Sequence, residues 1–307
     1  MVTKEWMRPA TSGEGQIFSR LWAADEPKAI LLLAHGMAEH SGRYSAFGSY
    51  LAQKGWVVCM NDHAGHGKSA LTQGYFAEQN GWSCVVNDLH NLLEEVMALY
   101  PGLPVCMMGH SMGSFLTREF ITRWGGGLSG TVLCGTMGKN PALGLAAALA
   151  DLQCKIKGPK SPGKLLDKLS TGSYYKKFSN PVNQFAWLSA NRENCLAYAA
   201  DPACGFLFTA SAFRDLFRGV QAISGEAWAQ KVPKNLPILL VSGQDDPVGS
   251  MGKGPEQVAS WLKAAGVEDV SLTLYPGMRH EILNEDAQQT VFEEIEHWLS
   301  QTLPGIR

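Results

Sequence analysis

The sequence lacks the features that define several large classes of protein. Its 307 residues contain no apolar run long enough to span a membrane, and the first residues contain no apolar signal region. The net charge is only −2, which gives no general attraction to nucleic acid. No glycine-rich phosphate loop of the P-loop or dinucleotide type is present. We therefore expect a protein that does not span a membrane and binds neither nucleic acid nor a nucleotide cofactor.

Disulfide chemistry is also poorly supported. The seven cysteines are an odd number, and no C-x-x-C pair occurs among them. Three of them, Cys59, Cys106 and Cys134, fall in apolar, strand-like segments. Such cysteines are typical of buried, reduced thiols, which persist in reducing compartments. The sequence therefore predicts a soluble protein in the cytoplasm.

Strand-like and helical patterns alternate along most of the chain. With 45% hydrophobic residues the chain can bury a substantial core. Short runs that are apolar throughout indicate strands covered on both faces, as in a parallel sheet. The alternation therefore predicts an α/β fold with a mostly parallel sheet flanked by helices. The predicted strands include Ala29–Ala34, Trp56–Met60, Val105–Met108, Thr131–Cys134, Pro237–Val241 and Val270–Tyr275, and the helices include Ser45–Lys54, Trp82–Tyr100, Ser111–Trp124, Pro255–Ala265 and Asp286–Leu303.

The alternation stops after Thr136. No buried strand is evident from residue 138 to residue 233, where the segments are helical and aromatic. We predict a mainly helical cap at 138–233, inserted into an α/β core formed by 1–137 and 234–307. Aromatic residues of the cap either form its own core or line an apolar substrate pocket. They are Tyr174, Tyr175, Phe178, Phe185, Trp187, Phe206, Phe208, Phe213 and Phe217.

A G-x-S-x-G pattern, Gly109–Gly113, joins an apolar strand to an amphipathic helix. This context is that of a nucleophile elbow, in which a tight turn holds the serine in a strained conformation. Glycines two residues to either side remove side chains that would collide. The pattern predicts that Ser111 stands clear of the sheet, ready to attack a carbonyl carbon.

A serine hydroxyl needs an imidazole to take its proton. In strand–helix chains of this type the base follows the nucleophile and the acid along the sequence, so only His280 and His297 lie late enough. His297 falls within an amphipathic helix, where a surface position is the simpler interpretation. His280 follows a strand and a turn, the place where an α/β sheet positions its chemistry. We therefore predict His280 as the base.

The acid that orients this base is expected just after the strand Pro237–Val241. Asp245 and Asp246 compete for the role. Asp246 precedes Pro247, which holds it in an extended conformation, so that Asp245 points the other way. We predict Asp246 as the acid, with Asp245 as the alternative.

The oxyanion hole requires two backbone N–H groups, one after the nucleophile and one from an early loop. We assign the N–H groups of Met112 and Met37. Gly36 allows the backbone to approach closely, and His35 is predicted to be a structural hydrogen-bonding residue, with a second base as the alternative. This chemistry needs no metal and no cofactor, and we expect none.

Five segments of the chain together resemble one branch of the α/β-hydrolases, which contains monoacylglycerol lipases and lysophospholipases and is also described as serine aminopeptidase-like. The resemblance extends over nearly the whole chain outside the middle third. One departure is Ala64, where the family often has arginine in a D-x-R-G-H-G segment. The segments that carry the resemblance are His35–Tyr44, Asn61–Ser69, Gly109–Gly113, Gly243–Val248 and Tyr275–Glu285.

The resemblance implies the same triad, Ser111, Asp246 and His280, with Met37 and Met112 at the oxyanion hole. The function expected is a serine ester hydrolase that cleaves a single-chain acyl lipid, a monoacylglycerol or a lysophospholipid, through an acyl-serine. The alternatives are a small-ester esterase, an aminopeptidase, or a non-catalytic binding protein. An aminopeptidase would need carboxylates for a free amine, and nothing in the sequence orients those of the cap, namely Glu193, Asp201, Asp215 and Glu226.

The beginning of the cap is unusually basic. The apolar segment Leu143–Leu152 precedes a series of lysines opposed only by Asp151 and Asp167. Either this segment rests on an anionic membrane surface and draws lipid from it, or it is a solvated face of an ordinary helix. The lysines are Lys155, Lys157, Lys160, Lys164, Lys168, Lys176 and Lys177.

Overall fold

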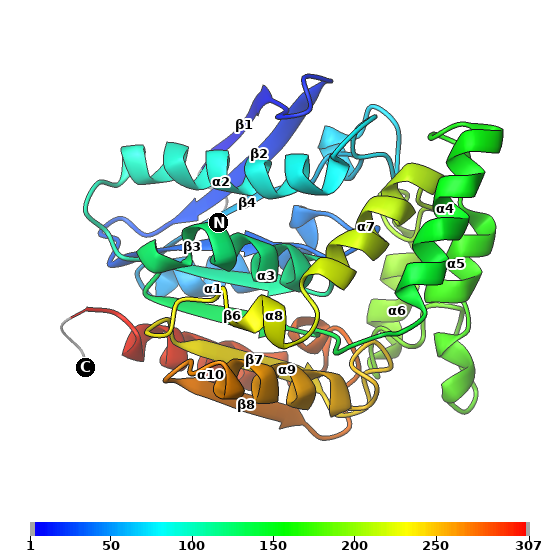
Figure 1. Cartoon of the computed structure of the whole chain (residues 1–307). Helices are drawn as coiled ribbons and strands as arrows, with labels where there is room; N and C mark the ends of the chain where they lie inside the picture. The colour runs from blue at the N-terminus through cyan, green and yellow to red at the C-terminus, as the bar shows by residue number, and fades with distance from the viewer. Residues whose placement is uncertain (1–3, 305–307) are drawn as a thin grey trace.

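An eight-stranded, mostly parallel sheet forms the centre of the protein (Figure 1). The computed structural model describes residues 4–304. The strand order is β1-β2-β4-β3-β5-β6-β7-β8, and only the β1–β2 and β2–β4 pairs are antiparallel. This architecture confirms the predicted α/β fold. The strands are β1 (Lys4–Pro9), β2 (Gln16–Ala23), β3 (Ala29–Ala34), β4 (Trp56–Asn61), β5 (Val105–His110), β6 (Gly130–Cys134), β7 (Ile238–Gly243) and β8 (Val270–Tyr275).

The central strands are apolar throughout because both faces of the sheet are covered. Along β3, Ile30 and Leu32 join one buried cluster, whereas Leu31 and Leu33 join a second cluster on the opposite face. Helices α2, α3 and α9 contribute to the first cluster, and α1 and α10 to the second. Their bounds are α1 (Ser45–Gln53), α2 (Gly81–Leu99), α3 (Met112–Trp124), α9 (Lys253–Ala264) and α10 (Gln288–Gln301).

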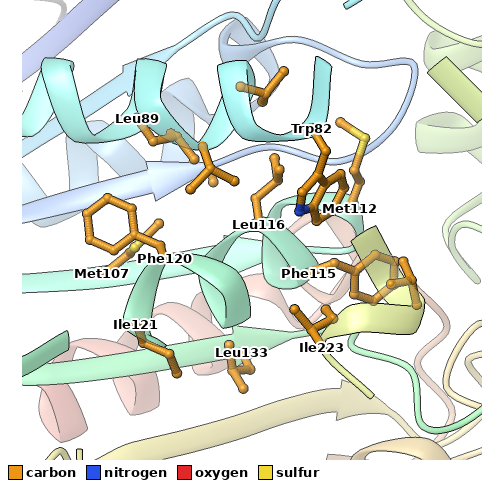
Figure 2. Close-up of a cluster of buried hydrophobic side chains, with 14 of the residues drawn as sticks. Trp82, Leu89, Met107, Met112, Phe115, Leu116, Phe120, Ile121, Leu133 and Ile223 are labelled. Atoms are coloured by element: carbon orange, nitrogen blue, oxygen red, sulfur yellow. The ribbon is translucent and has the colours of Figure 1, made fainter. Parts of the chain in front are cut away.

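Helix α3 lies deep in the first cluster (Figure 2). Its apolar residues Phe115, Leu116 and Phe120 recur at helical spacing and are all buried. They pack with Trp82 and Leu89 of α2 in the same cluster. This packing fixes the helix that begins immediately after Ser111.

The first two strands were not predicted from the sequence. Strands β1 and β2 form a hairpin, and β2 pairs with β4. The polar residues Ser19 and Arg20 interrupt the apolar pattern of β2, although both are buried. Asp88 of α2 holds the hairpin turn, because its Oδ1 accepts hydrogen bonds from the backbone N–H and the hydroxyl of Thr11 at 2.9 and 2.7 Å.

The chain between β6 and β7 forms several helices, of which α4, α5, α6 and α7 lie toward one end of the sheet, at the right of Figure 1, whereas α8 packs against α9. Helix α7 packs along α4 and also contacts α2 and α3. The carboxylate of Asp215 on α7 accepts a hydrogen bond from the N–H of Gly81 at 3.1 Å and so caps α2. The helices are α4 (Leu143–Lys157), α5 (Lys164–Ser170), α6 (Arg192–Ala200), α7 (Ala210–Ala222) and α8 (Glu226–Ala229).

The division of the chain into a core and a cap at residues 138 and 233 stays a prediction.

Within residues 4–304, no helix combines the length and the apolar character that crossing a membrane requires.

Candidate active site

Ser111 lies at the junction between β5 and α3. Its backbone angles are φ +54° and ψ −121°, a conformation that is costly for a residue other than glycine. A Cβ atom on Gly109 would lie 2.2 Å from the carbonyl oxygen of Gly113, and one on Gly113 would lie 2.1 Å from that of Ala34. The backbone N–H of Ser111 donates to the carbonyl of Cys134 at 2.9 Å. The strained turn predicted from the motif is therefore present.

His280 and Asp246 are hydrogen-bonded to each other below this turn. The distance from His280 Nδ1 to Asp246 Oδ2 is 2.9 Å, and both side chains are almost completely buried. Since the carboxylate accepts from Nδ1, the proton of a neutral imidazole lies on Nδ1 and the lone pair on Nε2. His280 Nε2 is buried and makes no hydrogen bond within residues 4–304.

The carboxylate of Asp246 is itself fixed by its neighbours. Its Oδ1 accepts from the N–H of Val248 at 2.8 Å, and its Oδ2 accepts from the hydroxyl of Ser242 at 3.3 Å. Asp245 is exposed and His297 is exposed on α10, so the structure brings neither alternative to the pair.

The loop after β3 passes directly over Ser111. A Cβ on Gly36 would lie 2.6 Å from Glu39 Oε1 and 3.1 Å from the Cβ of Ser111, so a larger residue here would displace these side chains. Met37 and Met112 border the same cavity as Ser111 and His280. The N–H of Gly36 is already engaged, because it donates to Glu39 Oε1 at 2.5 Å.

Beneath this loop lie three buried histidines, His35, His63 and His66. His35 Nε2 accepts a hydrogen bond from the N–H of His63 at 2.9 Å, and His66 Nε2 accepts from the N–H of Ala38 at 3.2 Å. Burial lowers the pKa of His35 to about 3 and that of His66 to about 4, and it also lowers the pKa of His63. All three are therefore neutral at pH 7 and act as hydrogen-bonding supports of the loop.

A buried ionic network surrounds the site. Arg43 donates to both oxygens of Glu281, at 2.5 and 2.8 Å, and to Glu39 Oε2 at 2.9 Å. Glu39 also accepts from Tyr44 at 2.8 Å and lies 3.3 Å from His110 Nδ1. This network joins the loop after β3 to the residue that follows His280.

The network also sets the charge of His110, the residue before Ser111. Burial is the largest influence and lowers the pKa of His110, but the hydrogen bond and the charge of Glu39 outweigh it and raise the pKa. For Glu39, burial raises the pKa, whereas His110 and Arg43 outweigh burial and hold it well below its usual value. His110 Nε2 lies 3.2 Å from the carbonyl oxygen of His280, so a charged His110 donates from both nitrogens.

A cavity of about 330 Å³ opens from Ser111 and His280 toward the inserted helices. Its volume is at the lower end of the range of small-molecule sites, roughly 300–1,000 Å³. The wall is largely apolar and combines residues of α3, α4 and α7. Representative lining residues are Phe115, Leu143, Ala146, Leu149, Leu216 and Val220.

The aromatic residues between 138 and 233 divide into two groups. Tyr174, Phe185, Trp187, Phe206 and Phe217 line the cavity, and Trp187 lies 5.2 Å from His280, ring centroid to ring centroid. Tyr198 on α6 also lines the cavity. The remaining aromatic residues do not line it, and Phe208 and Phe213 are completely buried.

One cluster within residues 4–304 has side chains of the kind that bind metal ions, namely His40, Asp201 and Cys204. Their ligand atoms lie within 4.8 Å of one another. His40 Nδ1 accepts from the N–H of Gly42, so the imidazole proton lies on Nε2, which donates to Asp201 Oδ2 at 2.9 Å. Since both nitrogens of His40 already make hydrogen bonds, this cluster links the loop after β3 to the segment after α6.

The residues that pair around this site were not predicted from the sequence. Arg43 and Glu281 were given no role, although both lie in the segments that carry the family resemblance. Both are charged residues in loops that follow apolar strands. A charged side chain that is buried there needs a partner of opposite charge, and this requirement could have indicated the pair. Arg118 was also missed, a lone basic residue on the buried face of α3.

The mostly parallel sheet, the sharp strand–turn–helix at Ser111 and the helices inserted after β6 define an α/β-hydrolase. The family described as Serine aminopeptidase, S33, matches residues 25–287, so the chain belongs to this family. The protein is therefore an enzyme of the hydrolase class, and the resemblance noted from the sequence is confirmed.

Three similar proteins match along almost their full lengths. The Monoacylglycerol lipase of Mycolicibacterium smegmatis is 29% identical over 97% of this chain and 99% of its own. The human Monoglyceride lipase is 29% identical over 94% of this chain and 89% of its own. The crystal structure of a thermostable carboxyl esterase from Bacillus coagulans in complex with glycerol is 31% identical, covers 98% of this chain and 99% of its own, and has a TM-score of 0.93.

Proposed function

We propose that the protein is a serine ester hydrolase that cleaves monoacylglycerols into glycerol and a fatty acid. The observation that carries this proposal is the pair Asp246–His280 beside Ser111, at the end of an apolar cavity. Two relatives that match almost the whole chain are monoacylglycerol lipases, and the carboxyl esterase of similar structure holds glycerol.

In the proposed mechanism, Ser111 Oγ attacks the ester carbonyl carbon while His280 Nε2 takes the hydroxyl proton. The N–H groups of Met37 and Met112 stabilise the oxyanion of the tetrahedral intermediate. When the carbon–oxygen bond breaks, His280 returns the proton to the leaving glycerol oxygen. A water molecule then attacks the acyl-serine, with His280 again taking and returning the proton. Asp246 holds the imidazole and stabilises its charged form.

The apolar wall of the cavity favours binding of the acyl chain of the substrate. Residues 138–233 form the proposed cap, and its helices α4 and α7 supply much of the apolar wall. An acyl chain in such a cavity would be stabilised by roughly 25 cal/mol for each Å² of apolar surface removed from water.

An aminopeptidase is less well supported, because the carboxylates near Ser111 are already paired. Glu39 and Glu281 line the cavity, but both are already paired with Arg43. Of the cap carboxylates, Asp201 pairs with His40, and Asp215 caps α2. A free amine would have to compete with these partners.

The test is hydrolysis of monoacylglycerols and of nitrophenyl esters of two to sixteen carbons, with Ser111→Ala as the background. We expect activity that depends on Ser111, that peaks at eight carbons or longer, and that includes release of glycerol from monolauroylglycerol. Activity confined to acetate and butyrate would indicate a small-ester esterase instead. If a fluorophosphonate does not label Ser111, a non-catalytic binding protein becomes the better explanation.

We further propose that the cap makes transient contact with an anionic membrane surface. Large apolar side chains of α4 and α5 are 53–70% exposed, which is unusual for residues of this kind, and the seven lysines of this region are all exposed. The apolar residues are Leu145, Leu152, Ile156, Leu165 and Leu169.

Replacing Lys155, Lys157 and Lys164 by glutamine should weaken binding to vesicles that contain phosphatidylserine, because each lysine near the surface contributes about 1 kcal/mol. Co-sedimentation with vesicles measures the effect. The matched control replaces Lys231, Lys253 and Lys263, three exposed lysines outside α4 and α5, and should leave binding unchanged. Equal binding by both sets of variants would contradict membrane contact through the cap.

A reducing, cytoplasmic location is part of the proposal. All seven cysteines are free, and five of them are buried. Thiol titration of the purified, denatured protein should find seven reactive groups, and a smaller number after purification without reductant would point to an oxidising compartment.

A further inference from the structure

Arg118 is a charged residue buried completely in the core, on the helix that follows Ser111. Burial lowers its pKa to about 9, and no carboxylate within residues 4–304 offsets this effect. A guanidinium taken out of water without a carboxylate destabilises a fold unless other polar groups surround it. Polar groups other than carboxylates must therefore stabilise the Arg118 guanidinium.

Arg118 binds backbone oxygens at both ends of the inserted helices. Its Nη1 donates to the carbonyl oxygen of Met137 at 2.8 Å and lies 3.4 Å from the hydroxyl of Thr136, in the segment that leaves β6 for α4. Its Nη2 donates to the carbonyl oxygen of Ile223, where the chain leaves α7. The Arg118 side chain thus binds both connecting segments, the one that leads from β6 to α4 and the one that follows α7.

The chemistry of these contacts suits a guanidinium. Ile223 is the C-cap residue of α7, and the carbonyl groups at a helix C-terminus carry partial negative charge. The guanidinium centre also lies 4.3 Å from the ring of Trp228, whose indole N–H donates to the carbonyl of Arg118 at 2.9 Å. A lysine would present a single charged point and could not reach both carbonyl oxygens in a fixed fork.

The segment held by Arg118 touches the reacting groups. Cys134 O accepts the N–H of Ser111, and a Cβ on Gly135 would lie 3.1 Å from Cε1 of His280, so the backbone there lies against the imidazole. Met137 lines the cavity, as does Val220 in the last turn of α7. A shift of either connection would therefore move the cavity wall relative to Ser111.

We propose that Arg118 is a positioning residue that fixes the cap over the catalytic centre by anchoring both of its connections to α3. This role rests on the proposed ester hydrolysis. Arg118 does not line the cavity. It acts through Met137 and Ile223, which keep α4 and α7 at a fixed distance from the nucleophile. Substrates that need the cap wall should depend on Arg118, whereas substrates that need only the catalytic centre should not.

The test compares Arg118→Lys and Arg118→Met with Arg123→Met, an exposed arginine on the same helix. Active sites are counted with a fluorophosphonate, so that unfolded protein does not contribute. Nitrophenyl acetate reports on the catalytic centre alone, and nitrophenyl laurate reports on the centre and the cap wall. We expect kcat/KM for the laurate to fall about tenfold or more, mainly through KM, because a small misplacement of a binding wall is costly. The value for the acetate and both values for Arg123→Met should change less than twofold.

Hydrogen exchange supplies a second readout. In Arg118→Lys, amides of residues 137–143 and 220–229 should lose protection while those of β5 and β6 keep theirs. Should both Arg118 variants fail to fold, Trp228→Leu, which removes the ring beside the guanidinium, is expected to show the same preference for the short ester. Equal losses for both esters, or a uniform rise in exchange, would overturn the role of Arg118. A wild-type protein that is inactive on both esters would instead refute the proposed hydrolase function.

Discussion

The histidines beneath the loop after β3 should make the protein's stability fall as the pH is lowered from 6.5 to 5. His35 and His66 have folded-state pKa values of about 3 and 4, whereas the unfolded chain has a value of about 6.5. The unfolded state therefore binds more protons in this range, and the free energy of unfolding decreases with falling pH. Each of the two histidines should remove about 1.5 kcal/mol between pH 6.5 and 5, or about 3 kcal/mol together.

His63 adds to the loss in this window, because burial lowers its pKa as well. The other buried groups act mainly outside this window. His110 has a raised pKa, so the stability it contributes is present below pH 6.5 and is lost as the pH rises above it. Glu39 has a lowered pKa, so its contribution begins to be lost only below its unfolded value of about 4.5. These groups are the same in wild type and in the variants, so their contribution cancels when the two are compared.

The assay is urea unfolding at pH 6.5, 6.0, 5.5 and 5.0 for wild type, His66→Gln and His297→Gln. His66→Gln lowers stability at every pH because it disturbs a buried hydrogen bond to Ala38. Its loss between pH 6.5 and 5 should nevertheless be about 1.5 kcal/mol smaller than that of wild type, since one titrating group is gone. His297→Gln, at an exposed position, should follow wild type. If His66→Gln and wild type lose equal stability, His66 is not held neutral and the reasoning is refuted.

Two further predictions concern the centre itself. Asp246→Asn should lower kcat for ester hydrolysis by a factor on the order of 10⁴, because the imidazole then adopts the wrong tautomer, while Asp245→Asn stays near wild type. Comparable losses in the two variants would contradict the assignment of the acid. Gly113→Ala should destabilise the protein by about 3 kcal/mol or more in urea unfolding, because its Cβ would meet the carbonyl oxygen of Ala34 at 2.1 Å. Gly126→Ala, which has nothing within 4 Å of the new Cβ, should be nearly neutral, and equal effects of the two would refute the steric argument.

The central sheet could be predicted from the sequence because its signal is local. Strands such as β3 and β5 are apolar throughout, and helices such as α2 and α3 have a buried face at helical spacing. Predicted and observed bounds agree to within a few residues. Strands β1 and β2 were not predicted, because the buried residues Ser19 and Arg20 interrupt the apolar pattern of β2.

The residues of the candidate site were also accessible to sequence reasoning, since each follows a strand whose end was predictable. The geometry that pairs Asp246 with His280 was not, because Asp245 and Asp246 differ only in the direction their side chains take after β7. The proline that follows Asp246 favoured this residue, and the fold places its Oδ2 2.9 Å from His280 Nδ1.

The sequence by itself determined the strand–helix alternation, the strained turn at Ser111 and the order of the groups around it, because these depend on neighbouring residues. Only the tertiary structure decided which distant charges meet. Arg43 reaches Glu281 across 238 positions of sequence, and Arg118 binds the carbonyl of Ile223 across 105 positions. Such contacts leave no local pattern, since the free energy that selects them comes from pairing buried charges with whatever polar groups the packed fold brings to them.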